Sequence, residues 1–134
     1  MWHVCAVYIT EDEQQAQAEC EGAFKRFFAY NSTAVPALRR DPSMKQRLLE
    51  SNYAFYAGEI MERLPRLSYE EIVTQDYAFV GTAERVLEQC IALKQAVGVD
   101  EILIITHYGD IEVSKALRTQ ELFAREVIPK LRAM

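Results

Sequence analysis

The segment THYGD, Thr106 to Asp110, closes an apolar run and carries side chains that could do chemistry. His107 is the side chain whose charge changes most easily near neutral pH, so it could move a proton. Tyr108 offers an aromatic face on which a flat ligand could stack, and Gly109 allows a ligand to approach the backbone closely. We interpret His107 and Tyr108 as catalytic candidates. The alternative is a loop whose polar groups only hydrogen-bond locally.

A second candidate is the pair Gly81-Thr82, where the apolar run Tyr77–Val80 passes into a helical pattern. The free N–H groups and the positive dipole end of a helix bind phosphates and other anions. A threonine in this position also caps a helix by accepting a hydrogen bond from its backbone. We interpret this pair, with Gly109, as a cofactor-binding candidate, and simple helix capping is the alternative.

Metal binding and an apolar substrate pocket are the remaining options. His3 and Cys5 share one face of a strand, as two metal ligands would, but two ligands do not make a site, and we expect no metal. Aromatic residues at helical spacing form either the core or the wall of a substrate pocket. These residues are Phe24, Phe27, Phe28, Tyr53, Phe55 and Tyr56.

Length and composition limit the class of protein. The 134 residues suffice for one domain, which we assign to residues 1–134. The formal net charge is −5 without an extended basic cluster, so neither nucleic acid nor a membrane is an expected partner. Three cysteines in apolar patterns indicate buried free thiols in a reducing compartment. The first residues show no basic region followed by an apolar core, so we expect no leader peptide. We expect a cytoplasmic protein.

The elements expected from the sequence follow the order β, α, α, short α, β, α, β, α, which is typical of α/β proteins with parallel strands and right-handed crossovers. The strands are Trp2–Ile9, Tyr77–Val80 and Glu101–Thr106. The helices run from a Thr10 cap to about Asn31, from a Ser43 cap toward Leu64, from a Ser68–Glu71 capping box, from Thr82 to a Gly98 stop, and from Val113 to Ile128 before Pro129. A loop is expected from Tyr30 to Ser43.

The amino-acid sequence of the second half of the chain resembles the C-terminal end of the bacterial luciferase-like, flavin-dependent monooxygenases. The segments that carry the resemblance are Gly81-Thr82-Ala83-Glu84, Gly98-Val99-Asp100 and Leu122–Pro129 (LFAREVIP). The resemblance covers essentially the whole chain, strongly after Tyr77 and loosely before it. Ala83 stands where the family usually has proline, a small change because proline there only preorganises the first helical turn.

The resemblance implies a partial (β/α)8, or TIM, barrel with about the last three βα units and a helical insertion after the first. In this family, reduced FMN supplied by a flavin reductase reacts with O2 to oxygenate an aldehyde or another organic substrate, and the missing first five strands hold most of the flavin contacts. Three strands cannot close a barrel. Two sheet edges would stay unpaired, and the apolar interior face would lack its other wall.

Three functions remain open on these grounds. The chain is either the C-terminal portion of such a monooxygenase, inactive without its N-terminal barrel portion, or a stand-alone homo-oligomer with a non-catalytic binding or interaction role. The third function is weak FMN binding by a dimer, in which two copies together rebuild the ligand-binding end of a barrel. The resemblance assigns no catalytic residue of the family to this chain, so the five candidates above rest on their own chemistry.

Overall fold

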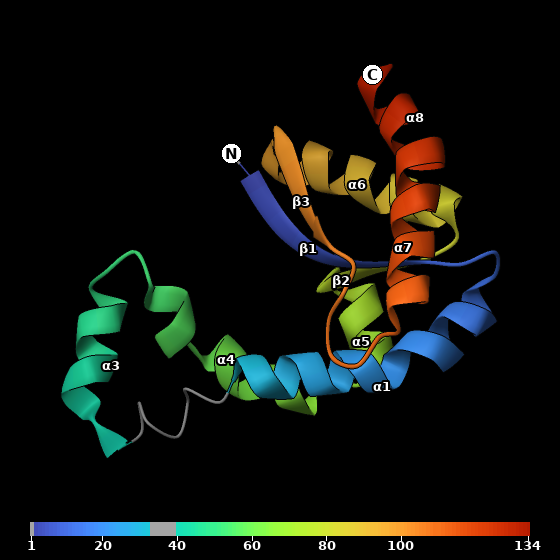
Figure 1. Ribbon diagram of the computed structural model, residues 1–134. Helices are drawn as coiled ribbons and strands as arrows, with labels where there is room; N and C mark the ends of the chain where they lie inside the picture. Colours follow the sequence, from blue (N-terminus) through green and yellow to red (C-terminus); the bar gives the residue numbers. More distant parts are fainter. Residues whose placement is uncertain (1, 33–39) are drawn as a thin grey trace.

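A parallel sheet of three strands forms the centre of the molecule (Figure 1). The computed structural model describes residues 2–32 and 40–134. Its strands are β1 (Trp2–Ile9), β2 (Ala78–Gly81) and β3 (Glu101–Ile105). The predicted α/β class, the parallel direction and the three strand positions are confirmed, with boundaries shifted by no more than one residue. Residues 33–39 of the predicted loop lie outside the described residues.

The strand order is β2-β1-β3, so the first strand lies in the middle. Ala6 of β1 is opposite both Ala78 of β2 and Ile105 of β3. In a (β/α)8 barrel, neighbours in the sheet are neighbours in the chain, so β2 would be the middle strand of three consecutive units. Here the chain crosses back over β1 between β2 and β3, as it does in a doubly wound sheet.

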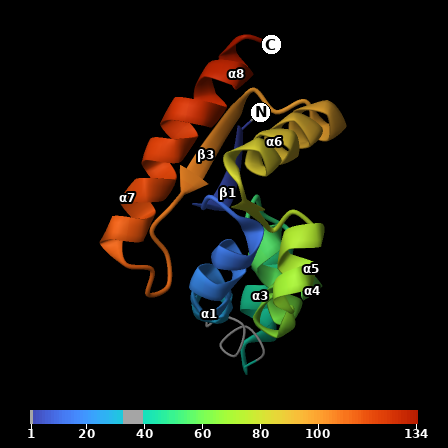
Figure 2. The same ribbon diagram turned by 90° about the vertical axis from the view of Figure 1, so that its right-hand side faces the viewer.

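This return over β1 puts helices on both faces of the sheet, because right-handed crossovers made in opposite directions lie on opposite faces (Figures 1 and 2). One face is covered by α1 (Glu13–Asn31), α4 (Glu59–Arg63), η2 (Leu64–Arg66) and α5 (Tyr69–Thr74). The other is covered by α6 (Ala83–Val97), η3 (Phe123–Val127) and α8 (Ile128–Arg132). Between these layers, α7 (Val113–Leu122) packs against β1.

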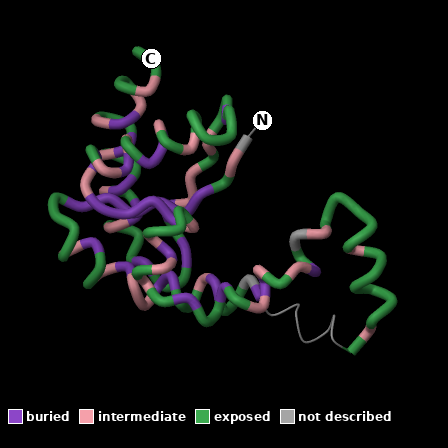
Figure 3. The backbone as a smooth tube through the Cα atoms, turned by 180° about the vertical axis from the view of Figure 1, so that it is seen from behind, coloured by how far each residue is buried: buried purple, intermediate pink, exposed green. Residues whose placement is uncertain are grey.

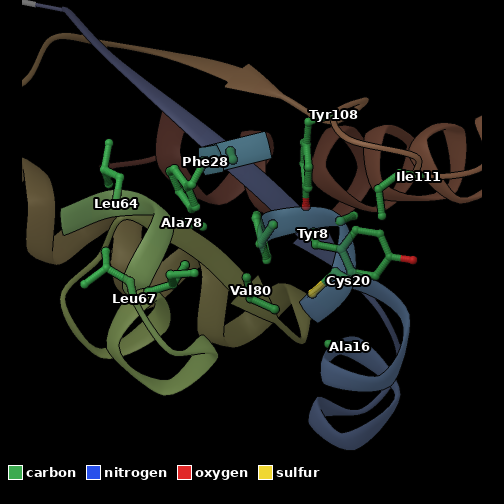
Figure 4. Close-up of a cluster of buried hydrophobic side chains, with 14 of the residues drawn as sticks. Tyr8, Ala16, Cys20, Phe28, Leu64, Leu67, Ala78, Val80, Tyr108 and Ile111 are labelled. Carbon is green, nitrogen blue, oxygen red and sulfur yellow. The ribbon is translucent and has the colours of Figure 1, made fainter. Parts of the chain in front are cut away.

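Alternate residues of β1 face the two layers, as expected for a strand buried on both sides. Ala6 and Tyr8 pack into the cluster that α1 covers, part of which Figure 4 shows. Cys5, Val7 and Ile9 pack with α6 and η3. The expectation of an apolar interior face without a wall is therefore wrong for Ala6 and Tyr8, which α1 covers, whereas Val4 on the same face is 42% exposed.

Two predicted helix signals are confirmed in detail. Ser68 and Glu71 form a capping box at the start of α5, each side chain bonding to the other's backbone N–H. Gly98 ends α6 in the left-handed conformation, with φ 67°. Both signals depend on contacts within a few residues, which is why the sequence predicts them well.

Two other caps are supplied by neighbours of the predicted residues. Asp12, not Thr10, caps α1, and its carboxylate accepts a hydrogen bond from the Gln15 N–H at 2.7 Å. Thr10 is buried and still pairs with the backbone of β2, so the strand ladder holds it out of the helix. Asp41, not Ser43, caps α3 (Pro42–Leu49), because a proline in the first turn fixes the helix start one residue after Asp41.

The helix predicted from Ser43 toward Leu64 is broken into short pieces. After α3, the Ser51 hydroxyl donates to the Leu48 carbonyl at 2.8 Å and accepts from the Tyr53 N–H at 3.0 Å, which replaces helical hydrogen bonding. A short 3-10 helix, η1 (Ala54–Ala57), and α4 follow. No residue of α3 is buried, and the helix lies apart from the sheet (Figures 1 and 3).

Pro129 does not end the last helix as predicted. The preceding turn, η3, is a π-helix, and this wider turn relieves the loss of the proline N–H that would break an α-helix. The chain therefore continues through α8 to Arg132. Within the described ranges, no helix is both long and apolar enough to cross a membrane.

Candidate functional site

The carboxyl ends of the three strands lie on one side of the sheet, where α/β proteins hold their ligands. The predicted segments Gly81-Thr82 and Thr106–Asp110 both begin there, after β2 and β3. Because β1 lies between these two strands, the segments are brought to the same side but not next to each other. In a doubly wound sheet the usual ligand position is the gap between β1 and β3, where the connections leave toward opposite faces.

Tyr108 is a core residue beside this gap. Its side chain is 4% exposed and stacks on Phe24 of α1, with ring centroids 4.8 Å apart and an interplanar angle of 15°. Burial raises the pKa of its hydroxyl, and that hydroxyl has no hydrogen-bond partner among the described residues. The close-up in Figure 4 places it in the same buried cluster as Tyr8 and Cys20. Because the side chain is almost fully buried, stacking on a flavin would require Tyr108 to leave this cluster.

The residues on either side of Tyr108 have different surroundings. His107 is exposed, whereas Gly109 has a φ of 60° and lies against α1. A Cβ on Gly109 would be 2.6 Å from the carbonyl oxygen of Ala23. Asp110 then pairs with Arg26, whose Nε is 2.9 Å from Asp110 Oδ1. The close approach expected of Gly109 is therefore to the backbone of α1.

Gly81-Thr82 begins α6 in the way the capping alternative predicts. Thr82 Oγ1 accepts a hydrogen bond from the Arg85 N–H at 3.3 Å. A cavity of about 230 Å³ opens beside Gly81, between α1, α5 and α6. Arg85 lines it, but its Nε is 3.6 Å from Glu13 Oε1, so an anion entering this cavity would compete with a carboxylate that already pairs with Arg85.

The main polar cluster near the end of β1 joins Tyr8, Glu19 and Arg118, which sequence reasoning missed. The Tyr8 hydroxyl donates to Glu19 Oε2 at 2.6 Å, and Arg118 Nη2 donates to the same oxygen at 2.5 Å. Gln15 donates to the other carboxylate oxygen at 3.0 Å. The side chains of Glu19 and Arg118 are 18% and 33% exposed. Residues from β1, α1 and α7 thus meet at one carboxylate.

The surroundings of this cluster change its acid–base chemistry. Desolvation raises the pKa of the Glu19 carboxyl, but hydrogen bonds from Tyr8, Arg118 and Gln15 outweigh it and lower the pKa to about 2. Burial and the bond to Glu19 raise the pKa of Tyr8. Glu19 therefore remains ionised and Tyr8 protonated near neutral pH. Neither is poised to exchange a proton there, so the cluster is an ion pair that holds α7 to α1.

The helix α7 also closes the end of β1 with neutral hydrogen bonds. Thr119 Oγ1 accepts from the Ile9 N–H at 3.2 Å. Gln120 donates to Thr106 Oγ1 at 2.8 Å, at the end of β3. The gap between β1 and β3 is therefore occupied by side chains of the protein itself.

The three cysteines are poor candidates for a nucleophile or a metal ligand. Cys5, Cys20 and Cys90 are free and buried, as predicted. Burial raises their pKa values to about 12, 12 and 11, so the reactive thiolate is suppressed. His3, half-buried, lies near Cys5 on β1, yet no group of three or more His, Cys, Asp or Glu side chains in residues 2–32 and 40–134 could hold a metal ion.

The aromatic residues divide between the core and the surface. Phe24 and Phe28 are buried in the cluster under α1, and Phe27 packs against it. Tyr53 and Tyr56 are 63% and 49% exposed. The core interpretation is confirmed for the residues on α1. The side chain of Phe55 lies outside the described parts.

Two solved structures of monooxygenases are similar to this chain. The monooxygenase RslO1 from Streptomyces bottropensis matches with a TM-score of 0.61 and 17% identity, over 97% of this chain and 30% of that one. The oxygenating constituent of 3,6-diketocamphane monooxygenase from Pseudomonas putida, a type II Baeyer–Villiger enzyme in complex with FMN, matches with a TM-score of 0.58 and 18% identity, over 96% and 33%. This chain thus spans about a third of either structure, and at these identities the likeness concerns the fold. No protein-family model and no curated protein matches the sequence.

Proposed function

We propose that this chain is related to the C-terminal portion of the luciferase-like, flavin-dependent monooxygenases and has no oxygenase activity on its own. The observation that carries the proposal is the partial likeness: nearly all of this chain matches two monooxygenases, but accounts for only about a third of each. The segments Gly81–Glu84 and Leu122–Pro129 support the same family. The partial-barrel origin of the fold is part of this proposal.

The residues at the carboxyl ends of the strands do not fit a bound FMN. Tyr108 is stacked on Phe24, and α7 is bonded across the end of β1. The cavity beside Gly81, about 230 Å³, is below the ~300 Å³ at which ligand pockets usually begin. Oxygenation of an aldehyde or other organic substrate, and delivery of reduced FMN by a flavin reductase, would therefore belong to a longer protein of this family.

A stand-alone protein with a non-catalytic binding or interaction role is the second candidate, and the strand order favours it. β3 pairs with the edge of β1 that a preceding barrel strand would need. Helices already cover both faces of β2 and of the carboxyl half of β1. An N-terminal barrel portion could join this sheet only if β3 first left β1.

An anaerobic calorimetric titration of the purified chain with reduced FMN tests the proposal. We expect only heats of dilution up to millimolar flavin, because no described site at the carboxyl ends is open and large enough. Oxidised FMN serves as the matched titrant, and circular dichroism of the same sample establishes that the chain is folded.

Saturable binding of reduced FMN near one flavin per chain would contradict the proposal. It would favour instead a dimer that rebuilds a flavin site. Single substitutions at Gly81, Thr82, His107 and Tyr108 would then show whether the predicted candidates form that site.

A further inference from the structure

β3 is the least covered strand in the described part of the chain. Its sequence, Glu-Ile-Leu-Ile-Ile, is that of a strand buried on both faces of a parallel sheet. Yet no residue of β3 is buried, whereas all four residues of β2 are. Leu103 is 52% exposed, and its neighbour across the ladder, Val4 of β1, is 42% exposed. An apolar stripe thus reaches the surface where β3 and β1 lie side by side.

The two edges of the sheet differ in protection. On β2, the Gln89 side chain accepts a hydrogen bond from the Val80 N–H at 3.2 Å and donates to Asp76 at 3.0 Å. A buried side chain thus satisfies one backbone group on the outer edge of β2. In the described part of the chain, no strand pairs with the outer edge of β3. Unprotected edges of this kind pair with another strand.

Open space also lies on both faces of the sheet beside β3 and β1. A cavity of about 680 Å³ lies between β3, α6 and α8 and includes Ile102. A second, of about 480 Å³, lies on the opposite face and includes Val4 and Ile105. The larger opening includes Leu103, so a partner placed against the edge of β3 would border it.

We propose that two copies of this chain form a dimer by antiparallel pairing of β3 with β3 around a two-fold axis at Leu103. The proposal rests on the stand-alone candidate function and specifies its interaction surface. The result is a continuous six-stranded sheet in which Val4 and Leu103 of one copy meet Leu103 and Val4 of the second copy on one face.

The sequence of β3 suits pairing with itself. In a register centred on Leu103, Glu101 lies opposite Ile105 of the second copy and Ile102 opposite Ile104. Glu101, the only charged residue of β3, therefore does not lie opposite Glu101 of the second copy. Two like charges do not face each other across the interface. A second copy of the chain supplies this complementary pattern without further assumption.

Light scattering of the Leu103→Lys variant tests this interface. The unmodified chain is expected at twice its 15.4 kDa mass at micromolar concentration. Leu103→Lys should raise the dissociation constant at least ~100-fold, because two ammonium groups would face each other within an apolar stripe. Leu117→Lys is the matched control: Leu117 is 51% exposed and belongs to α7, whose main strand contact is β1, so the dimer should persist.

A cysteine pair tests the register. Residues directly opposite in an antiparallel ladder have Cα atoms ~4.5–5.5 Å apart, within reach of a disulfide. Leu103→Cys should therefore give a disulfide-linked dimer on mild oxidation, and Leu117→Cys should not. Circular dichroism establishes that each variant is folded.

A monomeric unmodified chain would overturn the proposal, as would a dimer that survives Leu103→Lys or is broken by Leu117→Lys. These outcomes are separate from the flavin titration. A monomeric chain would contradict the interface but would not affect the proposed absence of flavin binding. Flavin binding by a dimer that depends on Leu103 would support the interface but contradict the proposed function.

Discussion

Replacing Gly109 by alanine is expected to lower the free energy of unfolding by about 3–4 kcal/mol. The backbone at Gly109 has a φ of 60°, which costs an alanine ~1–2 kcal/mol. The new Cβ would also lie 2.6 Å from the Ala23 carbonyl oxygen, a contact that only a backbone shift can relieve. The loop after β3 would have to move away from α1, and the stacking of Tyr108 on Phe24 would weaken with it.

Gly98 provides the control. It has nearly the same backbone conformation, with φ 67°, but a Cβ there would meet no atom within 4 Å. Gly98→Ala should therefore cost only the ~1 kcal/mol of the left-handed conformation. Urea unfolding followed by circular dichroism measures both variants. Equal losses at the two positions would mean that Gly109 does not lie against α1.

Substituting Glu19 by glutamine is expected to cost about 2 kcal/mol at pH 7. Glutamine keeps the shape of the side chain but removes the charge that the partly buried Arg118 and the Tyr8 hydroxyl share. Glu21→Gln is the matched control on the same helix: Glu21 pairs with Lys25 at 2.8 Å on the surface, and its loss should cost no more than ~0.5 kcal/mol. Similar losses for the two variants would contradict a structural role for the Tyr8–Glu19–Arg118 cluster.

The same substitution predicts a pH dependence with a definite sign. The pKa of Glu19 in the folded chain is about 2, below its ordinary value of 4.5, so the folded state favours the ionised carboxylate. Its contribution is therefore fully present above about pH 4.5 and is lost as the pH falls toward about 2. The stability difference between the unmodified chain and Glu19→Gln should shrink across this window. A difference that stays constant would show that Glu19 is not held ionised by its partners.

Local features of the fold could be predicted from the sequence, and distant ones could not. The strand β1, the capping box at Ser68 and the stop at Gly98 depend on neighbouring residues, and the structure confirms each. The helix continues past Pro129 because a π-helical turn precedes the proline, and no local sequence pattern predicts that turn. The position of β3 beside β1 depends on the direction in which the chain crosses over after β2. The amino-acid sequence of a strand does not specify this direction.

The candidate site shows the same division. Thr82 caps α6 as its position in the sequence indicates. Tyr108 looked like an exposed loop aromatic, but Phe24, more than eighty residues earlier in the chain, buries it. Glu19 and Arg118 are separated by 99 residues, and neither lies in a motif. The signal that could have drawn attention to them is the placement of a charged residue among apolar neighbours on an amphipathic helix.

The strand order β2-β1-β3 is the feature on which the functional proposals depend, and backbone NOEs in an isotopically labelled chain measure it directly. We expect NOEs between β1 and β3, such as Cys5 to Ile104 and Ala6 to Ile105, together with NOEs between β1 and β2 and none between β2 and β3. NOEs joining β3 to residues Ala78–Gly81, without any between β1 and β3, would contradict this order. The edge of β1 would then be free for the earlier strands of a barrel, and the chain would need those strands to complete its sheet.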